Sequence, residues 1–403
     1  MKINIATSWA ALARYRHAWS ALLARSGANQ PTMSPLWMQA WWETFGGDQG
    51  RELRAVLVFR GSRLVGLAPF LVRRVWYRNV LPLRRIEFLA SGESEADEIC
   101  SDYINVVAEA GMEPLVARAV VDALVRGELG WWDELVLDLM DGRAAMTEHL
   151  AGKLGRAGLH VEIMAQRPCP YATLPASWDG YLSQLSSSGR YMVRRTLRDL
   201  ERWAGDSIEV TRAETLADVE KGRQILIDLH NHRWRQAGET GMFASSKFLH
   251  FHRRVMPELF AHQALDLMWL SCKGAPIASI YNVVWDNRVY FYQSGRRTDL
   301  PRKIRPGIAM HAYAIQHAIG RGRVLYDFLS GPSRYKKQLS TAENSLVRVR
   351  ALRRSPAALL RRQAQRGEKV LREVRQRIRE RQDVGDESDS TAGVSTAGAV
   401  SGL

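Results

Sequence analysis

Residues 289–336 read VYFYQSGRRTDLPRKIRPGIAMHAYAIQHAIGRGRVLYDFLSGPSRYK, and this stretch decides the fold. Its β-branched and aromatic residues predict a strand that ends at Ser294-Gly295. A loop rich in Arg and Lys then leads to Pro306-Gly307, where proline suits the first turn of a helix. The helix is expected over GIAMHAYAIQHAIGRG, and a second strand over VLYDFLS. The stretch therefore predicts a strand–loop–helix–strand unit, a building block of α/β sheets.

The residues before this unit extend it into a larger sheet. Residues 265–296 predict three consecutive strands, with tight turns at Lys273-Gly274 and Asp286-Asn287. Two helices are expected ahead of them, over about 178–203 and 215–236. The second half of the chain thus runs helix, helix, antiparallel meander, loop, helix, strand.

The first half shows a looser version of the same order. Strand-like runs are followed by a helix, a strand and a second helix, at residues 53–60, 63–74, 86–91, 102–107, 112–127, 132–140 and 143–157. Pro168, Pro170 and Pro175 then mark a connection. We therefore expect an α/β (α+β) protein of two similar units with mixed central sheets, over residues 1–166 and 167–347.

The charge is concentrated at one end of the chain. The 403 residues carry a formal charge of +15, and the segment 348–381 holds 13 Lys or Arg against three Glu. We expect a third region, 348–403, made of an Arg-rich helix and a disordered tail of small polar residues. The basic balance therefore describes this tail more than a catalytic surface.

Targeting signals are not evident in the sequence. No run approaches the ~20 apolar residues that span a bilayer. The first 27 residues lack the continuous apolar segment of a secretory signal. Three widely spaced cysteines exclude a disulfide framework and give no zinc signature. The cysteine usage fits a reducing compartment, so we expect a cytoplasmic protein. His230 and His232 are two residues apart and point in different directions on a helix, so we expect no metal.

The basic loop and the helix that follows it are suited to phosphate. A helix N-terminus offers unpaired N–H groups and a partial positive charge, and glycine lets a ligand approach the backbone. The candidate cofactor-binding residues are Ser294, Gly295, Arg305, Gly307 and Ile308. The alternative is an ordinary capped helix in a basic loop.

The segment after the last strand offers candidate catalytic groups. Asp327 lies inside an apolar strand, where a carboxylate with a raised pKa could act as a base. Tyr335 could protonate a leaving group, and Lys336 stands beside it. The alternative is that Asp327 pairs with Lys336 or an arginine and only fixes the loop.

Candidate substrate-binding residues are taken from three helices: Arg194, Arg195, Trp234 and His311. Tryptophans at helical spacing in residues 37–42 could likewise line a carbohydrate or nucleic-acid groove. Side chains so spaced can also face a core, and exposed arginines can form a solvated face.

Together these motifs resemble the acetyltransferase family associated with cellulose and exopolysaccharide biosynthesis, the CelD or BcsL type, a branch of the GNAT superfamily. The resemblance covers roughly residues 15–345 and rests on five segments in order: SPLWMQAWWETFGG with RLVGLAPFLVRR, GRYMVRRTLRDLER, CKGAPIAS, VYFYQSGR…RPGIAM and YDFLSGPSRYK. The family is similar to Fem-type transferases, which carry two GNAT folds in one chain.

The resemblance implies transfer of an acyl group from acetyl-CoA or another acyl-CoA to an amine or hydroxyl, on a small molecule, sugar or polysaccharide precursor. In GNAT enzymes the pyrophosphate of the donor lies at the position that corresponds here to Arg305-Pro306-Gly307. The segment SGRRTDLPRKIRPG is longer and more basic than the usual superfamily signature, which leaves the donor open. A Fem-like transferase would use aminoacyl-tRNA instead. A third possibility is a non-catalytic accessory protein of a polysaccharide synthase complex, docked on it or on an anionic membrane by the basic tail.

Overall fold

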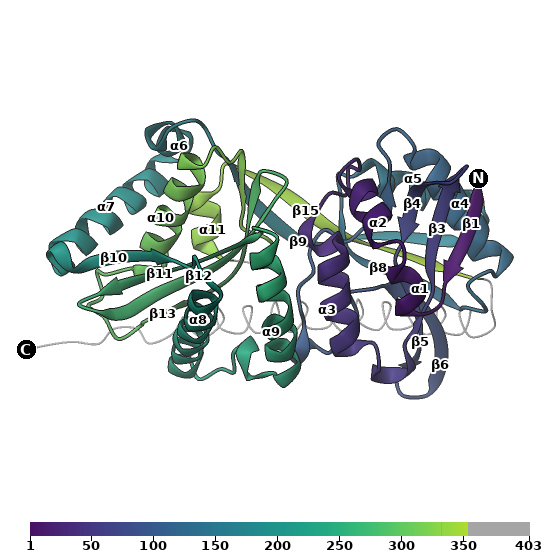
Figure 1. Ribbon diagram of the computed structural model, residues 1–403, viewed down its shortest axis with the longest axis horizontal. Coiled ribbons are helices and arrows are strands. Elements are labelled where there is room, and N and C mark those ends of the chain that lie inside the picture. Colours follow the sequence, from purple (N-terminus) through teal and green to yellow (C-terminus); the bar gives the residue numbers. More distant parts are fainter. Residues whose placement is uncertain (332, 354–403) are drawn as a thin grey trace, which may run out of the picture.

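The computed structural model describes residues 1–331 and 333–353, which form two α/β halves side by side (Figure 1). The N-terminal half contains β1 (Lys2–Ala6), α1 (Trp9–Ala13), α2 (Arg16–Leu23), α3 (Pro35–Phe45), β2 (Glu52–Leu53), β3 (Ala55–Arg60), β4 (Arg63–Ala68), β5 (Phe70–Tyr77), β6 (Leu81–Phe88), β7 (Val107–Ala108), α4 (Glu113–Arg126), β8 (Glu134–Asp141), α5 (Ala145–Arg156) and β9 (His160–Thr173).

The C-terminal half follows the order expected from the sequence. Its elements are α6 (Trp178–Gln184), α7 (Ser187–Ala204), β10 (Ile208–Arg212), α8 (Leu216–Gln236), α9 (Ser246–Ala261), β11 (Leu265–Cys272), β12 (Ala275–Trp285), β13 (Arg288–Arg296), α10 (Pro306–Gly320), β14 (Leu325–Asp327), α11 (Arg334–Leu339) and β15 (Ala342–Leu352). In Figure 1, α7, α10 and α11 lie on one face of its sheet and α8 lies on the other.

One mixed sheet runs through both halves. Its eleven strands have the order β10-β11-β12-β13-β14-β9-β15-β8-β6-β5-β2, and a second sheet of four strands has the order β1-β3-β4-β7. The β13–β14 and β6–β8 pairs are parallel, whereas the other described pairs are antiparallel. The expected mixed α/β fold is confirmed: the larger sheet is mixed, whereas the four-stranded sheet is antiparallel.

The two halves share the long strands β9 and β15. β15 pairs with β9 along its whole length and, from Leu346 onward, also with β8 of the N-terminal half. The end of β9 pairs with β14 of the C-terminal half. The boundaries expected at residues 166/167 and 347/348 fall inside these two strands. The third region was predicted to begin with a helix at Arg348, but its residues up to Leu352 belong to strand β15. Beyond Arg353, the predicted Arg-rich helix and disordered tail lie outside the described residues.

Local chemistry explains the meander of β11, β12 and β13. The two turns that join these strands consist of Lys273-Gly274 and Asp286-Asn287, and all four residues have positive φ, between 49° and 76°. Two-residue hairpin turns of this kind match the twist of the strands and favour Gly, Asn and Asp. The predicted turns are therefore confirmed.

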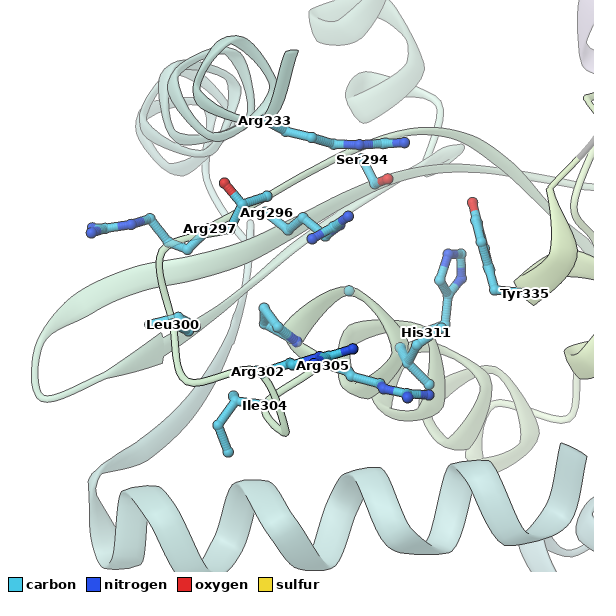
Figure 2. Close-up of a pocket in the computed structure, with 14 residues that line it drawn as sticks. Arg233, Ser294, Arg296, Arg297, Leu300, Arg302, Ile304, Arg305, His311 and Tyr335 are labelled. Carbon is cyan, nitrogen blue, oxygen red and sulfur yellow. The ribbon is translucent and has the colours of Figure 1, made fainter. Parts of the chain in front are cut away.

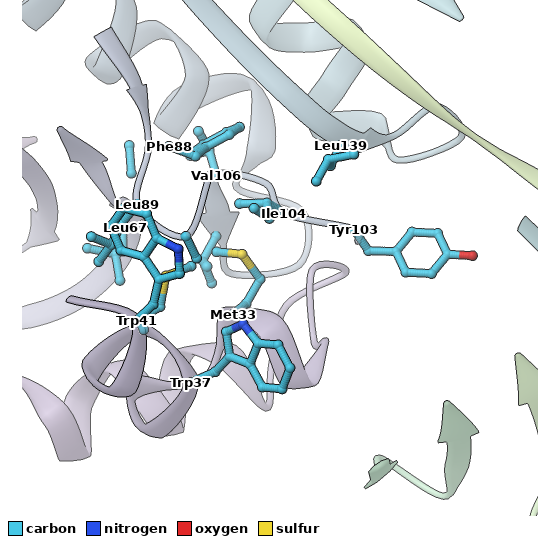
Figure 3. Packing of buried hydrophobic residues seen from close by; sticks show 14 of the residues in the cluster. Met33, Trp37, Trp41, Leu67, Phe88, Leu89, Tyr103, Ile104, Val106 and Leu139 are labelled. Carbon is cyan, nitrogen blue, oxygen red and sulfur yellow. The ribbon is translucent and has the colours of Figure 1, made fainter. Parts of the chain in front are cut away.

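Two tryptophans of α3 belong to the core, and one of them, Trp37, joins the two halves. The Ser34 hydroxyl accepts a hydrogen bond from the Trp37 N–H and so caps the helix. The Trp37 ring packs 4.9 Å from Phe251 of α9 and 5.5 Å from Tyr292 of β13. Trp37 and Trp41 are buried beside Met33 and Phe88 (Figure 3). Of the two interpretations of these tryptophans, packing in the core therefore holds for Trp37 and Trp41, and lining of a carbohydrate or nucleic-acid groove does not.

One predicted strand is wrong. Of residues 102–107 only Val107 enters a strand, because the preceding segment uses its polar side chains to bind other elements. Asp102 accepts hydrogen bonds from Ser330, and Tyr103 has a positive φ of 67° and donates to Asp327. Alternating hydrophobicity could not reveal partners so distant in sequence. None of the helices in the described ranges is both long and apolar enough to cross a lipid bilayer.

Candidate active site

A gap opens where β13 and β14 separate. These parallel strands pair at only three positions, from Arg288–Leu325 to Tyr290–Asp327. Beyond Tyr290, β13 continues to Arg296, whereas the chain after Asp327 leaves the sheet. A bulge at Tyr292 shifts the register between β12 and β13 at the same level. The backbone edge of β13 is thus left open toward α10 and α11.

A cavity of about 440 Å³ occupies this end of the sheet. Residues from β13, the loop after it, α8, α10 and α11 line the cavity: Arg233, Ser294, Arg296, Arg297, Thr298, Leu300, Arg302, Ile304, Arg305, Pro306, Gly307, Ile308, His311 and Tyr335. The volume lies within the range of small-molecule and cofactor sites. Figure 2 shows Arg233, Arg296 and Arg305 reaching toward the space between β13 and α10.

The cavity is strongly electropositive. Arginines line it and no carboxylate does. Arg297 pairs with Asp299, but Arg233, Arg296, Arg302 and Arg305 form no ion pair with any Asp or Glu within residues 1–331 and 333–353. Burial and the nearby Arg233 charge lower the pKa of Arg296. Unneutralised cations held this close together favour an anionic ligand.

The N-terminus of α10 adds one backbone donor, the Gly307 N–H, to these cations. The Arg305 carbonyl accepts hydrogen bonds from the N–H groups of Ile308 and Ala309, and Pro306 has no N–H. The Gly307 N–H comes too early in the helix to find a carbonyl within it. A Cβ added at Gly307 would lie 2.9 Å from Cδ of Arg296, so glycine also leaves room for the arginine. This arrangement fits a phosphate group.

His311 and Tyr335 stand side by side at the edge of the cavity, with ring centroids 5.2 Å apart (Figure 2). Burial and the Lys336 charge lower the pKa of His311 to about 3, so the imidazole is neutral at physiological pH. Burial raises the pKa of Tyr335 to about 12, although Arg233 and Arg296 oppose the shift. Tyr335 therefore keeps its proton and can donate it.

The structure brings six of the sequence-predicted site residues to one cavity: Ser294, Arg305, Gly307, Ile308, His311 and Tyr335. The other six lie elsewhere. Gly295 faces α8, and a Cβ added to it would lie 2.6 Å from the backbone nitrogen of His230. Trp234 donates a hydrogen bond from Nε1 to His230 Nε2 at 2.9 Å. Arg194 and Arg195 lie on the exposed face of α7.

Asp327 and Lys336 hold the loop after β14. Asp327 accepts hydrogen bonds from the Tyr103 hydroxyl at 2.8 Å and from the Leu329 N–H at 2.7 Å. Lys336 donates from Nζ to the carbonyls of Leu329 and Ser330. Burial raises the pKa of Asp327 to about 7 and lowers that of Lys336. Neither residue lines the cavity. Asp327 thus fixes the loop, but through Tyr103 and the Leu329 N–H rather than through the expected ion pair with Lys336 or an arginine. A direct catalytic role for either residue stays a prediction.

Residues that the sequence did not single out complete the site. Arg233 comes from α8, which packs against β13 at Gly295. Arg296 and Arg302 were visible only as members of a basic loop. Tyr103 reaches Asp327 from the other half of the chain. Arg233 and Tyr103 depend on tertiary packing and left no local signal, whereas the basic loop was a local signal for Arg296 and Arg302.

The N-terminal half repeats the order strand, helix, strand as β7, α4 and β8, but its helix begins with the opposite charge. β7 and β8 belong to different sheets. The first residue of α4 is the negatively charged Glu113, whereas the positively charged Arg305 directly precedes α10. A carboxylate in this first turn occupies the place that an anion would take.

Comparisons with known proteins agree with this division. The family described as acetyltransferase (GNAT) domain matches residues 187–337, from α7 to α11. The crystal structure of FemX covers 86% of this chain and 97% of its own, at 11% identity and a TM-score of 0.56. A conserved protein of unknown function from Bacteroides thetaiotaomicron covers 87% and 100%, at 12% identity and 0.52. No curated protein matches the sequence.

A tandem GNAT protein from clavulanic acid biosynthesis is also similar, at 9% identity, 88% coverage of this chain, 100% of its own and a TM-score of 0.43. The GNAT acetyltransferase family thus matches residues 187–337 of the C-terminal half, and the fold of FemX is similar over both halves of the chain. GNAT folds typically use acyl-CoA. In the part of the chain that the structure describes, no three His, Cys, Asp or Glu side chains gather as metal ligands would.

Proposed function

We propose that the protein is an acyl-CoA-dependent acyltransferase and that its donor site is the arginine-lined cavity between β13 and α10. The observation that carries this proposal is the cluster at a helix N-terminus, inside the GNAT domain, of four arginines without a carboxylate partner in the described chain. Coenzyme A carries a pyrophosphate and a 3′-phosphate, which match such a cluster. Arg305 and Gly307 would hold the pyrophosphate, and the acyl-pantetheine arm would run toward Ser294 and Tyr335.

The reaction proposed is direct transfer. An amine or hydroxyl attacks the thioester carbonyl, a C–N or C–O bond forms, and the C–S bond breaks. Open backbone N–H groups at the edge of β13 would stabilise the oxyanion. Tyr335 would give its proton to the leaving thiolate and regain one that the nucleophile loses. Acetyl-CoA is the proposed donor, and a small molecule, sugar or polysaccharide precursor is the proposed acceptor, as in the CelD-type resemblance.

Calorimetry with a series of ligands tests the donor site. Acetyl-CoA and CoA are expected to bind, and pantetheine, which lacks the phosphates, is expected to bind much more weakly. Arg305→Ala should weaken acetyl-CoA binding about tenfold, because one charge-assisted contact is lost. Gly307→Ala should weaken it by displacing Arg296.

The matched control is Arg195→Ala, which removes an exposed arginine outside the cavity and should leave the affinity unchanged. If neither acetyl-CoA nor CoA binds at millimolar concentration, the donor proposal is wrong. If acetyl-CoA binds, a screen of amino sugars and glycan precursors, read as release of the CoA thiol, identifies the acceptor.

The same cations support one alternative donor. Arg302 and Lys303 continue the positive charge from the cavity onto its exposed rim, which would suit an aminoacyl-tRNA of the Fem-like kind. Such binding would fall steeply with salt. Filter binding of aminoacyl-tRNA at low and high salt distinguishes the two donors. A cytoplasmic location, and docking of the basic tail on a polysaccharide synthase complex or an anionic membrane, complete the proposal.

A further inference from the structure

A row of buried polar side chains links β11 to the cavity across the sheet. Asn282 Nδ2 lies 3.4 Å from Asp266 Oδ2, and Asn282 Oδ1 lies 3.3 Å from the Tyr326 hydroxyl. The same hydroxyl lies 3.3 Å from His311 Nδ1. All four residues are buried, and only His311 lines the arginine-rich cavity.

The donors and acceptors of this row can run in only one direction. The Asp266 carboxylate pairs with Nε of Arg212 at 2.7 Å and can only accept hydrogen bonds. Asn282 must therefore turn its NH2 group toward Asp266 and its carbonyl toward Tyr326. Tyr326 donates its proton to that carbonyl. Its oxygen is left to accept, so the proton on the His311 ring lies on Nδ1.

A neutral ring with its proton on Nδ1 has a lone pair on Nε2. Burial and the charge of Lys336 keep His311 neutral, as its low pKa indicates. Phe291, Phe328 and Tyr335 surround the ring. Within residues 1–331 and 333–353, no side chain or backbone group is hydrogen-bonded to Nε2. This nitrogen is thus available to accept a hydrogen bond from a ligand in the cavity.

We propose that Asp266, Asn282 and Tyr326 are positioning residues that fix His311 in its Nδ1–H tautomer, so that Nε2 accepts a hydrogen bond from bound acyl-CoA. The pantetheine arm offers suitable donors in its amide N–H groups and its hydroxyl. The identity of this ligand rests on the proposed function, whereas the tautomer does not. The row serves orientation and not proton transport, because the Asn282 amide cannot pass a proton on in its ordinary form.

Nuclear magnetic resonance of the full chain, with ¹⁵N-labelled histidine, tests the tautomer directly. The signals of His311 are identified by their loss in His311→Gln. The unliganded protein should show the Nδ1–H form. Tyr326→Phe keeps the ring but removes the hydroxyl, and should leave a mixture of tautomers or the Nε2–H form. Tyr281→Phe is the matched control, since it removes another buried hydroxyl that has no hydrogen-bond partner in the described chain.

Acetyl-CoA then tests the contact with the ligand. On binding, the Nε2 resonance should move while Nδ1 keeps its proton, and Tyr326→Phe should raise the Kd about three- to tenfold, as loss of one hydrogen bond would. Arg305→Ala should weaken binding without changing the tautomer of His311. A merely structural effect of Tyr326→Phe would leave the tautomer as it was.

The results separate this proposal from the proposed function. An Nε2–H tautomer in the unliganded protein, or a tautomer unchanged in Tyr326→Phe, would overturn the positioning role. Acetyl-CoA that binds without moving the Nε2 resonance would overturn the ligand contact. If acetyl-CoA does not bind at all, the proposed donor and this contact fail together, while the spectrum of the unliganded protein still decides the role of the hydrogen-bonded row.

Discussion

At the scale of single residues, Asp327 makes folding depend on pH. Its pKa is about 7 in the folded protein, mainly because of burial, and close to 4 in an unfolded chain. The folded state therefore binds more protons between these values, and its stability falls as the pH rises from 4 to 7. The loss attributable to Asp327 is up to about 4 kcal/mol, since each pKa unit is worth about 1.4 kcal/mol.

Asp327→Asn should remove this dependence, because asparagine resembles the protonated acid and can still accept the hydrogen bond from Leu329. The measurement is denaturant unfolding of both proteins at pH 5 and pH 8. Wild type should lose stability over this range relative to the variant. If the two proteins lose stability in parallel, the raised pKa of Asp327 is wrong.

The same residue shows what the sequence could and could not reveal. Residues 324–330 alone showed that a carboxylate lies in an apolar strand. They did not show its partner Tyr103, because it lies in the other half of the chain and the polar segment around it resembles a strand. Likewise Pro306 and Gly307 located the start of α10 by local chemistry, whereas Arg233 enters the cavity only through the packing of α8 on β13.

At the scale of elements, a row of ion pairs binds β15 to the N-terminal half. Glu134 of β8 is fully buried between Arg85 of β6, at 2.6 Å, and Arg350 of β15, at 3.4 Å. Arg350 also pairs with Glu162 of β9 at 3.3 Å. Loss of the Glu134 charge would leave Arg85 with Glu87 and Arg350 with the half-exposed Glu162, so two largely buried arginines would lose the fully buried carboxylate that they share, which is costly.

Glu134→Gln should therefore lower the free energy of unfolding by about 3 kcal/mol or more. Glu162→Gln is the matched control, since the Glu162 side chain is 37% exposed and its loss should cost less than about 1 kcal/mol. Urea titration of both variants gives the comparison. Equal costs would show that burial does not decide the strength of these pairs.

At the scale of the whole molecule, the two halves are joined by more than a linker. β15 comes from the end of the described chain and lies between β8 and β9, while β14 closes against β9 from the other side. A sheet that runs through both halves in this way resists division into independent folding units. We therefore expect one cooperative thermal transition, with equal calorimetric and van't Hoff enthalpies.

Two truncations that differ by twelve residues test this expectation. A chain that ends at Arg353 keeps every strand of the described sheet, so it should melt cooperatively at nearly the temperature of the full chain. A chain that ends at Thr341 lacks β15 and should lose both halves, because the partners of β15 on β8 and β9 are left unpaired at the centre of the sheet. A chain ending at Thr341 that still shows a cooperative transition for residues 1–156 would demonstrate that the N-terminal half folds alone, and that β15 joins a preformed unit.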